Sequence, residues 1–306
     1  MELKAVSFQK SKRMSIVQLA GPWQNSFDYI SGAAAVKNDL IEVKEVSDAG
    51  SVNNLFVFNK SDKYVFFMDG DILMGAKQNR VLNTSVLLAP NSKSTLPVSC
   101  VEQGRWKKTS DSFAYTANIS PHRIRASKSE AVKKSLRKSN SYMADQGRVW
   151  NEVNRYHAAY RVKSSTMNLN ELFDSEGGNF EDYIKDFKPD EKANGLAVFS
   201  DDRLVNIDVF NRTDIYREYF PKILRSSAIE IFQLDDSARN LAEADAISRT
   251  ESLFGELAKA PFSEHPGVGE GNEKRYDNDE FTGFELSFGD KMVHLTLLSI
   301  EKGRDL

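Results

Sequence analysis

Residues 75–83, which read GAKQNRVLN, form the densest polar stretch inside otherwise apolar, strand-like sequence. Lys77 and Arg80 could bind an anion, Lys77 through the single charge of its ammonium group and Arg80 through two parallel hydrogen bonds from its guanidinium. Gln78 and Asn79 add amide donors and acceptors that suit a ribose or a base. These residue types could form a site for a ribose-phosphate ligand. From the residues alone, however, we favour the alternative, an exposed edge or loop whose polar side chains only face water.

Residues 99–106, which read SCVEQGRW, form a second stretch of this kind. Cys100 and Glu102 share one face if the preceding strand continues, and a neighbouring carboxylate raises a thiol pKa, so we expect a buried, unreactive Cys100. Glu102 could accept from an arginine as a structural ion pair, or act as a general base. Arg105 would add a phosphate-binding cation. Trp106 could stack on a base or sugar, although we favour a tryptophan in the core.

Other chemistries find no support in the pattern. The four histidines have no metal-ligand spacing, and no HExxH, CxxC or GxSxG motif occurs. The residues from Asp69 to Asp71 lack the later ligands of a calcium loop. The run GVGEG at 267–271 lacks the Lys-Ser/Thr of a phosphate-binding loop. We therefore predict no metal site, and no cofactor follows from the residues.

The elements around the two polar stretches predict that they meet in space. Strands are expected over 80–88 and 95–101, joined by a short turn at 89–94. An antiparallel pair with that connection places Arg80 opposite residues near Glu102. Three cations would then face one carboxylate, unless Asp69 or Asp71 supplies a second.

The remaining chain predicts an α+β fold. Strand-like runs with turn formers between them fill the first hundred residues, apart from a helix over 27–37 capped by Ser26, and indicate an antiparallel sheet or sandwich. Helices are expected in the middle: from a capping box at 127–130 to about 160, then over 169–173, 180–187, from Thr213, and from Ser237 to about 259. Hairpins are expected over 195–210 and 281–300, the second returning to the sheet.

Composition indicates one globular protein. The chain has 306 residues, of which 40% are hydrophobic and 28% charged, and no membrane-length apolar run or signal peptide. We predict a single compact domain over 1–306 in the cytoplasm; the alternative division is a β-rich part, 1–119, and a part with helices and hairpins, 120–306. Residues 105–165 carry 14 Lys and Arg against 4 Asp and Glu, and residues 166–306 carry 16 against 30. We expect this basic segment to be neutralised internally or solvated, with nucleic acid as the less favoured partner.

The sequence resembles the ARG- and rhodanese-phosphatase-superfamily-associated protein domain family, named for its association with ADP-ribosylglycohydrolases. The resemblance rests on GAKQNR at 75–80, on PVSCVEQGRW at 97–106, on the Gln-x-x-Val-Trp element at 146–150, and on a hairpin with Asp208 and Phe210. Asp71 stands where the family pattern has Glu. The acidic C-terminal third matches only loosely.

The resemblance implies an NAD- or ADP-ribose-related context, without an established catalytic residue, and it adds Gln146 and Trp150 to the residues expected at the ligand. Two hypotheses follow. In the first, the protein binds a nucleotide or ADP-ribose-like ligand through Lys77, Arg80, Arg105, Gln78 and Asn79, with Glu102 as the general base if a reaction occurs. In the second, it is a non-catalytic module for a protein or nucleic-acid partner, and the polar cluster is structural. Whether it is an enzyme stays open.

Overall fold

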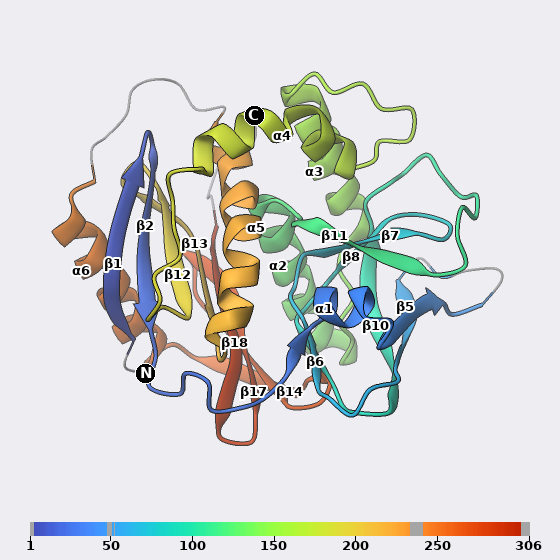
Figure 1. Cartoon of the computed structure of the whole chain (residues 1–306), viewed down its shortest axis with the longest axis horizontal. Coiled ribbons are helices and arrows are strands. Elements are labelled where there is room, and N and C mark those ends of the chain that lie inside the picture. Colours follow the sequence, from blue (N-terminus) through green and yellow to red (C-terminus); the bar gives the residue numbers. More distant parts are fainter. Residues whose placement is uncertain (1–2, 48–50, 52, 233–240, 301–306) are drawn as a thin grey trace. The chain divides into compact units, whose positions relative to one another are not determined.

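The computed structural model describes residues 3–47, 51, 53–232 and 241–300 (Figure 1). The chain forms two compact units, and it enters each of them more than once. The first unit comprises Met1–Phe27, Asn179–His265 and Asn272–Leu306, and the second comprises Asp28–Gly178 and Pro266–Gly271. The change from strands to helices near residue 120 lies inside the second unit, so it marks a change of element type and not a unit boundary.

The first unit is built on a sheet that joins the two ends of the chain. Its strand order is β1 (Lys4–Ser11), β2 (Met14–Ala20), β12 (Gly195–Ser200), β13 (Arg203–Phe210), β18 (Lys291–Ser299), β17 (Phe281–Phe288), β16 (Asn272–Tyr276) and β14 (Phe262–Pro266). The pairs from β1 to β16 run antiparallel. The predicted hairpins at 195–210 and 281–300 are both present, and the C-terminal hairpin does return to the sheet. The α+β prediction is confirmed.

Two helices cover opposite faces of this sheet. Val17 and its same-face neighbours pack with α6 (Glu243–Leu257) in an apolar cluster. The adjacent Gln18 instead accepts a hydrogen bond at 2.6 Å from Tyr216 of α5 (Thr213–Ile231), which runs along β12 and β13 (Figure 1). Because successive strand side chains alternate between faces, the sheet is covered on both. The predicted helix start at Ser237 lies outside the described residues.

The second unit contains two sheets around a shared apolar core. The larger sheet has the order β11 (Phe113–Ile119), β7 (Asp71–Gly75), β8 (Arg80–Leu82), β10 (Ser92–Cys100), β5 (Asn54–Asn59) and β4 (Ile41–Glu45). The smaller sheet has the order β15 (Val268–Gly269), β9 (Val86–Leu88), β6 (Val65–Phe67) and β3 (Ile30–Ser31). Val43 and Leu55 of the larger sheet share one buried cluster with Val65 and Val86 of the smaller. The pairs β3–β6 and β15–β9 are parallel, which sequence analysis did not anticipate.

The helices of the second unit begin elsewhere than the sequence predicted. Helix α1 (Gly32–Lys37) is capped by Ser31, whose side chain accepts from the amide of Ala34, and not by Ser26. Helix α2 (His122–Ser139) starts five residues before the predicted capping box, with Pro121 at its N-cap. Burial of this first turn outweighs the local capping signal. Helix α3 (Gln146–Ala159) follows. Helix α4 (Asn170–Ile184) begins in the second unit and ends in the first, and it joins two segments that were predicted as separate helices.

Candidate functional site

The two polar stretches meet where β8 pairs with the end of β10. The strands are antiparallel, and Arg80 lies opposite Cys100. The predicted convergence is therefore confirmed, although 80–88 is not one strand: β8 and β9 belong to different sheets. Before β8 the chain turns sharply at Gly75, with a φ of 129°. A Cβ at Gly75 would lie 2.6 Å from the Ser110 hydroxyl, so this turn requires glycine.

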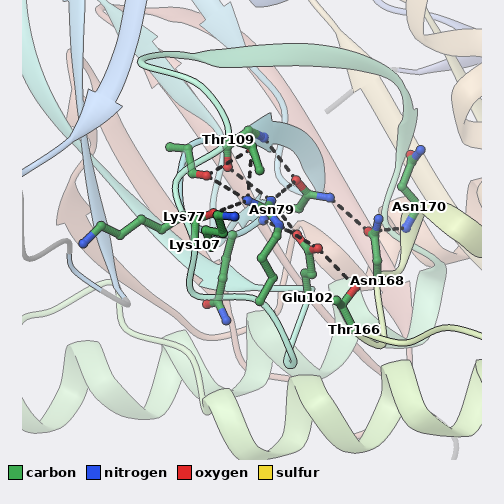
Figure 2. A network of polar contacts seen from close by, with 12 residues as sticks. Lys77, Asn79, Glu102, Lys107, Thr109, Thr166, Asn168 and Asn170 are labelled. Carbon is green, nitrogen blue, oxygen red and sulfur yellow. Dashed lines mark hydrogen bonds and ion pairs between the residues drawn. The ribbon is translucent and has the colours of Figure 1, made fainter.

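Glu102 is the centre of a buried network of polar contacts (Figure 2). Its Oε1 accepts from Arg105 Nε at 2.8 Å and from the Thr166 hydroxyl at 3.2 Å. Its Oε2 accepts from Arg105 Nη2 at 2.6 Å and from the backbone amide of Asn79 at 3.1 Å. Four donors thus occupy the carboxylate, and it is held by a bidentate arginine. This geometry favours a structural part for Glu102 over the predicted general base.

The remaining N–H groups of Arg105 donate hydrogen bonds to backbone carbonyls and side chains of neighbouring residues. Its Nη1 donates to the carbonyl oxygens of Ala76 at 2.7 Å and Lys107 at 3.1 Å, and to the Thr109 hydroxyl at 3.1 Å. Its Nη2 also donates to Asn79 Oδ1 at 3.2 Å. The guanidinium therefore ties residues 75–79 to residues 102–109. Arg105 was predicted to hold phosphate, and the structure instead directs its hydrogen bonds to the protein.

Asn79 extends the network to the segment before α4. Its Nδ2 donates to Asn168 Oδ1 at 3.0 Å, and the same oxygen accepts from the Asn170 amide at 3.0 Å (Figure 2). The Asn168 carbonyl lies 3.1 Å from His157 Nε2. Asn168 and Thr166 were missed by sequence analysis, because both are common polar residues that carry no motif.

Arg80, which follows Asn79 in the chain, is fully buried beside this network. Its Nη1 donates to Gln78 Oε1 at 3.0 Å and to the Cys100 sulfur, and its Nη2 donates to the Ser51 carbonyl at 3.2 Å. Gln78, also buried, donates at 3.4 Å to the carbonyl of Gln103. Neither side chain presents the exposed amide or guanidinium that the ribose-phosphate prediction requires.

The acid that faces Arg80 is Glu45, at the end of β4. Its Oε1 lies 3.6 Å from Arg80 Nη2. Asp69 and Asp71 were the candidates for a second carboxylate here, but Asp69 pairs with Arg125 at 3.0 Å, and Asp71 accepts from Tyr115 and from the Met68 amide. Glu45 carries no local motif, so only the pairing of β4 and β5 with β10 reveals it.

Gln146 binds the backbone of Cys100 at both polar groups. Its Oε1 accepts from the Cys100 amide at 2.8 Å, and its Nε2 donates to the Cys100 carbonyl at 2.9 Å. The side chain thereby replaces a neighbouring strand at the end of β10. Trp150, one turn later on α3, is half-buried, and its Nε1 has no hydrogen-bond partner among the described residues. Cys100 is buried, as predicted, and burial raises the pKa of its thiol to about 11, which disfavours the reactive thiolate.

Lys77 and Trp106 lie at the open side of the cluster. Lys77 lines a cavity of about 630 Å³ together with Lys44, Glu45, Ser47, Lys108 and Asp111. Its Nζ is 5.5 Å from the centre of the Trp106 ring, and Arg80 approaches that ring at 5.6 Å. Trp106 is 47% exposed, so the favoured prediction of a core tryptophan is wrong. Of the predicted site residues, Lys77 alone lines this cavity, and Trp106 adjoins it through Lys77.

A second buried charged group, which sequence analysis also missed, lies on α2. Arg125 forms the ion pair with Asp69, and Lys128 donates to the Leu82 carbonyl. The pKa of Lys128 is lowered to about 7, chiefly by burial and to a smaller extent by the nearby Arg125, while the carboxylates of Asp69 and Asp71 oppose this shift. Arg125 and Lys128 belong to the basic segment 105–165, and because both are buried they add no positive charge to the protein surface.

The family model of the ARG and Rhodanese-Phosphatase-superfamily-associated Protein domain matches residues 2–298. The chain belongs to this family. No curated protein and no solved structure matches the chain. The stretches at 75–80 and 97–106, on which the resemblance to this family rested, are the two that form the network, and Gln146 contacts their junction at Cys100. None of the described helices is long and apolar enough to cross a membrane.

Proposed function

We propose that this protein binds a phosphate-bearing, nucleotide-like small molecule in the cavity lined by Lys44, Lys77 and Lys108. The observation that carries the proposal is the gathering of three lysines around one cavity of about 630 Å³, within the size range of small-molecule sites. Trp106 supplies an exposed ring next to Lys77, on which a base can stack. An ADP-ribose or NAD-derived ligand has both the phosphates and the base.

The existing partners of these lysines are easily exchanged. Lys44 pairs with Glu42 at 2.7 Å, and Lys108 pairs with Asp111 at 2.6 Å, but each of the four side chains is at least 30% exposed. Exposed ion pairs contribute little free energy, so a phosphate with its higher charge can compete for the ammonium groups.

The buried network supports the cavity in this proposal. Arg105 and Glu102 hold the loop that carries Lys77, because Arg105 bonds the carbonyl of Ala76, the residue before it. No reaction is proposed, since both oxygens of Glu102 already accept hydrogen bonds from the protein.

Isothermal titration with ADP-ribose, ADP and inorganic pyrophosphate tests the proposal. We expect Lys77→Ala and Lys108→Ala each to weaken ADP-ribose binding about tenfold or more, because hydrogen bonds between charged groups are worth about 1.5–3 kcal/mol. Lys37→Ala is the matched control, since Lys37 is an exposed lysine of α1 outside the cavity, and it should bind as the parent does. Equal binding by all three variants, or no binding of any phosphate compound by the parent, would refute the proposal.

The second candidate function is a non-catalytic interaction module. The observation that favours it is the complete use of Glu102 and Arg105 in contacts within the protein. In that case Arg105→Ala lowers stability, and no nucleotide or pyrophosphate raises the melting temperature of the parent.

A further inference from the structure

Within the described part of the chain, one carboxylate oxygen of Glu45 has protein partners and the other has none. Its Oε1 accepts from the Lys77 amide at 3.4 Å and lies 3.6 Å from Arg80 Nη2. Its Oε2 is buried and has no hydrogen-bond partner among the described residues. The side chain is only 10% exposed. A buried carboxylate oxygen without a donor is costly, so Oε2 is a strong acceptor for any donor that reaches it.

Arg80 fixes the position of this carboxylate. It is fully buried, and its Nη groups are held by Gln78 and by the Ser51 carbonyl. Its Nη2 lies 3.6 Å from Glu45 Oε1, so the two side chains form an ion pair. Hydrogen bonds to an ionised acceptor are about twice as strong as those between neutral groups.

Glu45 lines the same cavity as Lys44, Lys77 and Lys108. A site for bare phosphate would gain nothing from a carboxylate, because the two anions repel each other. A carboxylate beside cations suits a ligand that carries hydroxyl donors as well as phosphate. The ribose of a nucleotide offers vicinal hydroxyls, and acidic residues accept from ribose hydroxyls in dinucleotide-binding folds.

We infer that Glu45 accepts a hydrogen bond from a ribose hydroxyl, so that the cavity selects ribonucleoside phosphates over deoxy analogues. This inference rests on the proposed nucleotide site and names the residue that gives it specificity. Glu45 thereby distinguishes a nucleotide from inorganic phosphate, which only the lysines would hold.

The test compares ADP, 2′,3′-dideoxy-ADP and pyrophosphate on the parent and on Glu45→Gln. The parent should bind ADP about tenfold or more tightly than the dideoxy compound, in line with the strength of a hydrogen bond to a charged group. In Glu45→Gln this preference should fall below about threefold, the amide being a neutral and weaker acceptor, while pyrophosphate binds at least as tightly as to the parent. Glu42→Gln, at a half-buried acid on the same strand that does not line the cavity, is the matched control and should keep the full preference.

The outcomes separate the two proposals. If ADP and pyrophosphate bind the parent but the dideoxy compound binds equally well, the role of Glu45 is refuted and the phosphate site stands. The role of Glu45 is refuted in the same way if Glu45→Gln keeps the full preference. If the parent binds none of the three compounds, both proposals fail. Should Glu45→Gln fail to fold, equal binding of ADP and the dideoxy compound by the parent would still refute the role of Glu45.

Discussion

Arg80 illustrates how much a single residue's role depends on its burial. The arginine has no exposed surface, and its charge faces Glu45, the Cys100 sulfur and the Ser51 carbonyl. An arginine in that position is a structural group, because a ligand would first have to displace these protein contacts. Only the exposed side of the cluster, with Lys77, is open to a ligand.

Replacing Arg80 should therefore unfold the protein more readily. Arg80→Ala leaves the carboxylate of Glu45 buried without its cation, and such a change costs about 3–5 kcal/mol. Urea denaturation of the variant measures the loss. Arg148→Ala, at an exposed ion pair, serves as the control and should change stability by less than about 0.5 kcal/mol. A loss below about 1 kcal/mol for Arg80→Ala, together with lost ligand binding, would instead make Arg80 part of the ligand site.

Lys128 predicts a pH dependence of stability. Its pKa is lowered to about 7 in the folded protein, whereas a lysine in the unfolded chain titrates near about 10.4. Above pH 7 the unfolded state therefore holds more protons, and stability rises with pH. Between pH 7 and about 8.5 this single group should add about 1.5 kcal/mol.

Denaturation at several pH values in that window, with parent and Lys128→Met, isolates the contribution. The variant should lose the upward trend, because methionine fills a similar volume without a titrating group. Lys134→Met removes an exposed lysine of the same helix and should keep the trend. Parallel curves for the parent and Lys128→Met would contradict the lowered pKa.

At the scale of elements, the hairpin of β17 and β18 belongs to the same sheet as the N-terminal strands β1 and β2, and it joins that sheet through β13. Alternation in FELSF predicts one buried face, and Phe284 and Leu286 are buried, while Phe288 is half-buried. Gly289 has a φ of 61°, which suits the two-residue Gly-Asp turn. The hairpin continues the sheet that β1 and β2 begin, and it supplies much of its core.

Leu286→Ala should destabilise the protein by about 2–4 kcal/mol, because it opens a cavity in a packed sheet face. The free energy of unfolding in urea is the measurement. A comparison with Ser287→Ala, at a partly exposed neighbour on the same strand, controls for changes in strand propensity. A loss as small as that of the control would show that this face is not part of the core.

At the scale of the whole molecule, the units divide the charge differently from the sequence segments. The second unit contains 21 Lys and Arg against 17 Asp and Glu, and the first contains 20 against 27. The excess of +10 in residues 105–165 is thus reduced to +4 within its own unit. Two of its cations, Arg125 and Lys128, are buried as well.

We therefore expect weak binding of short single-stranded RNA. Lys134, Arg137 and Lys138 lie exposed at the end of α2 and are the cations a nucleic acid would meet first. Fluorescence anisotropy at about 50 and 150 mM salt should show affinity that falls steeply with salt, since phosphate contacts release counterions. Tight binding at about 150 mM salt that disappears when these three residues are changed to Glu would contradict this expectation and make nucleic acid the favoured partner.

The sequence by itself determined the α+β class, the C-terminal hairpin and the meeting of the two polar stretches. Each follows from local information: side-chain alternation, turn residues, and an antiparallel pair that places Arg80 opposite Cys100. The family was also predicted from the sequence, and the family model that matches residues 2–298 confirms it.

The tertiary structure alone decided which side of the polar cluster is open. Glu45 comes from a strand far upstream, and Thr166 reaches Glu102 from 64 residues downstream. Trp106 is exposed where its type favoured the core, and Lys128 is buried where its type favoured water. Burial depends on which distant segments pack over a side chain. No local pattern carries that information, so the cavity beside Lys77 appears only once the chain is folded.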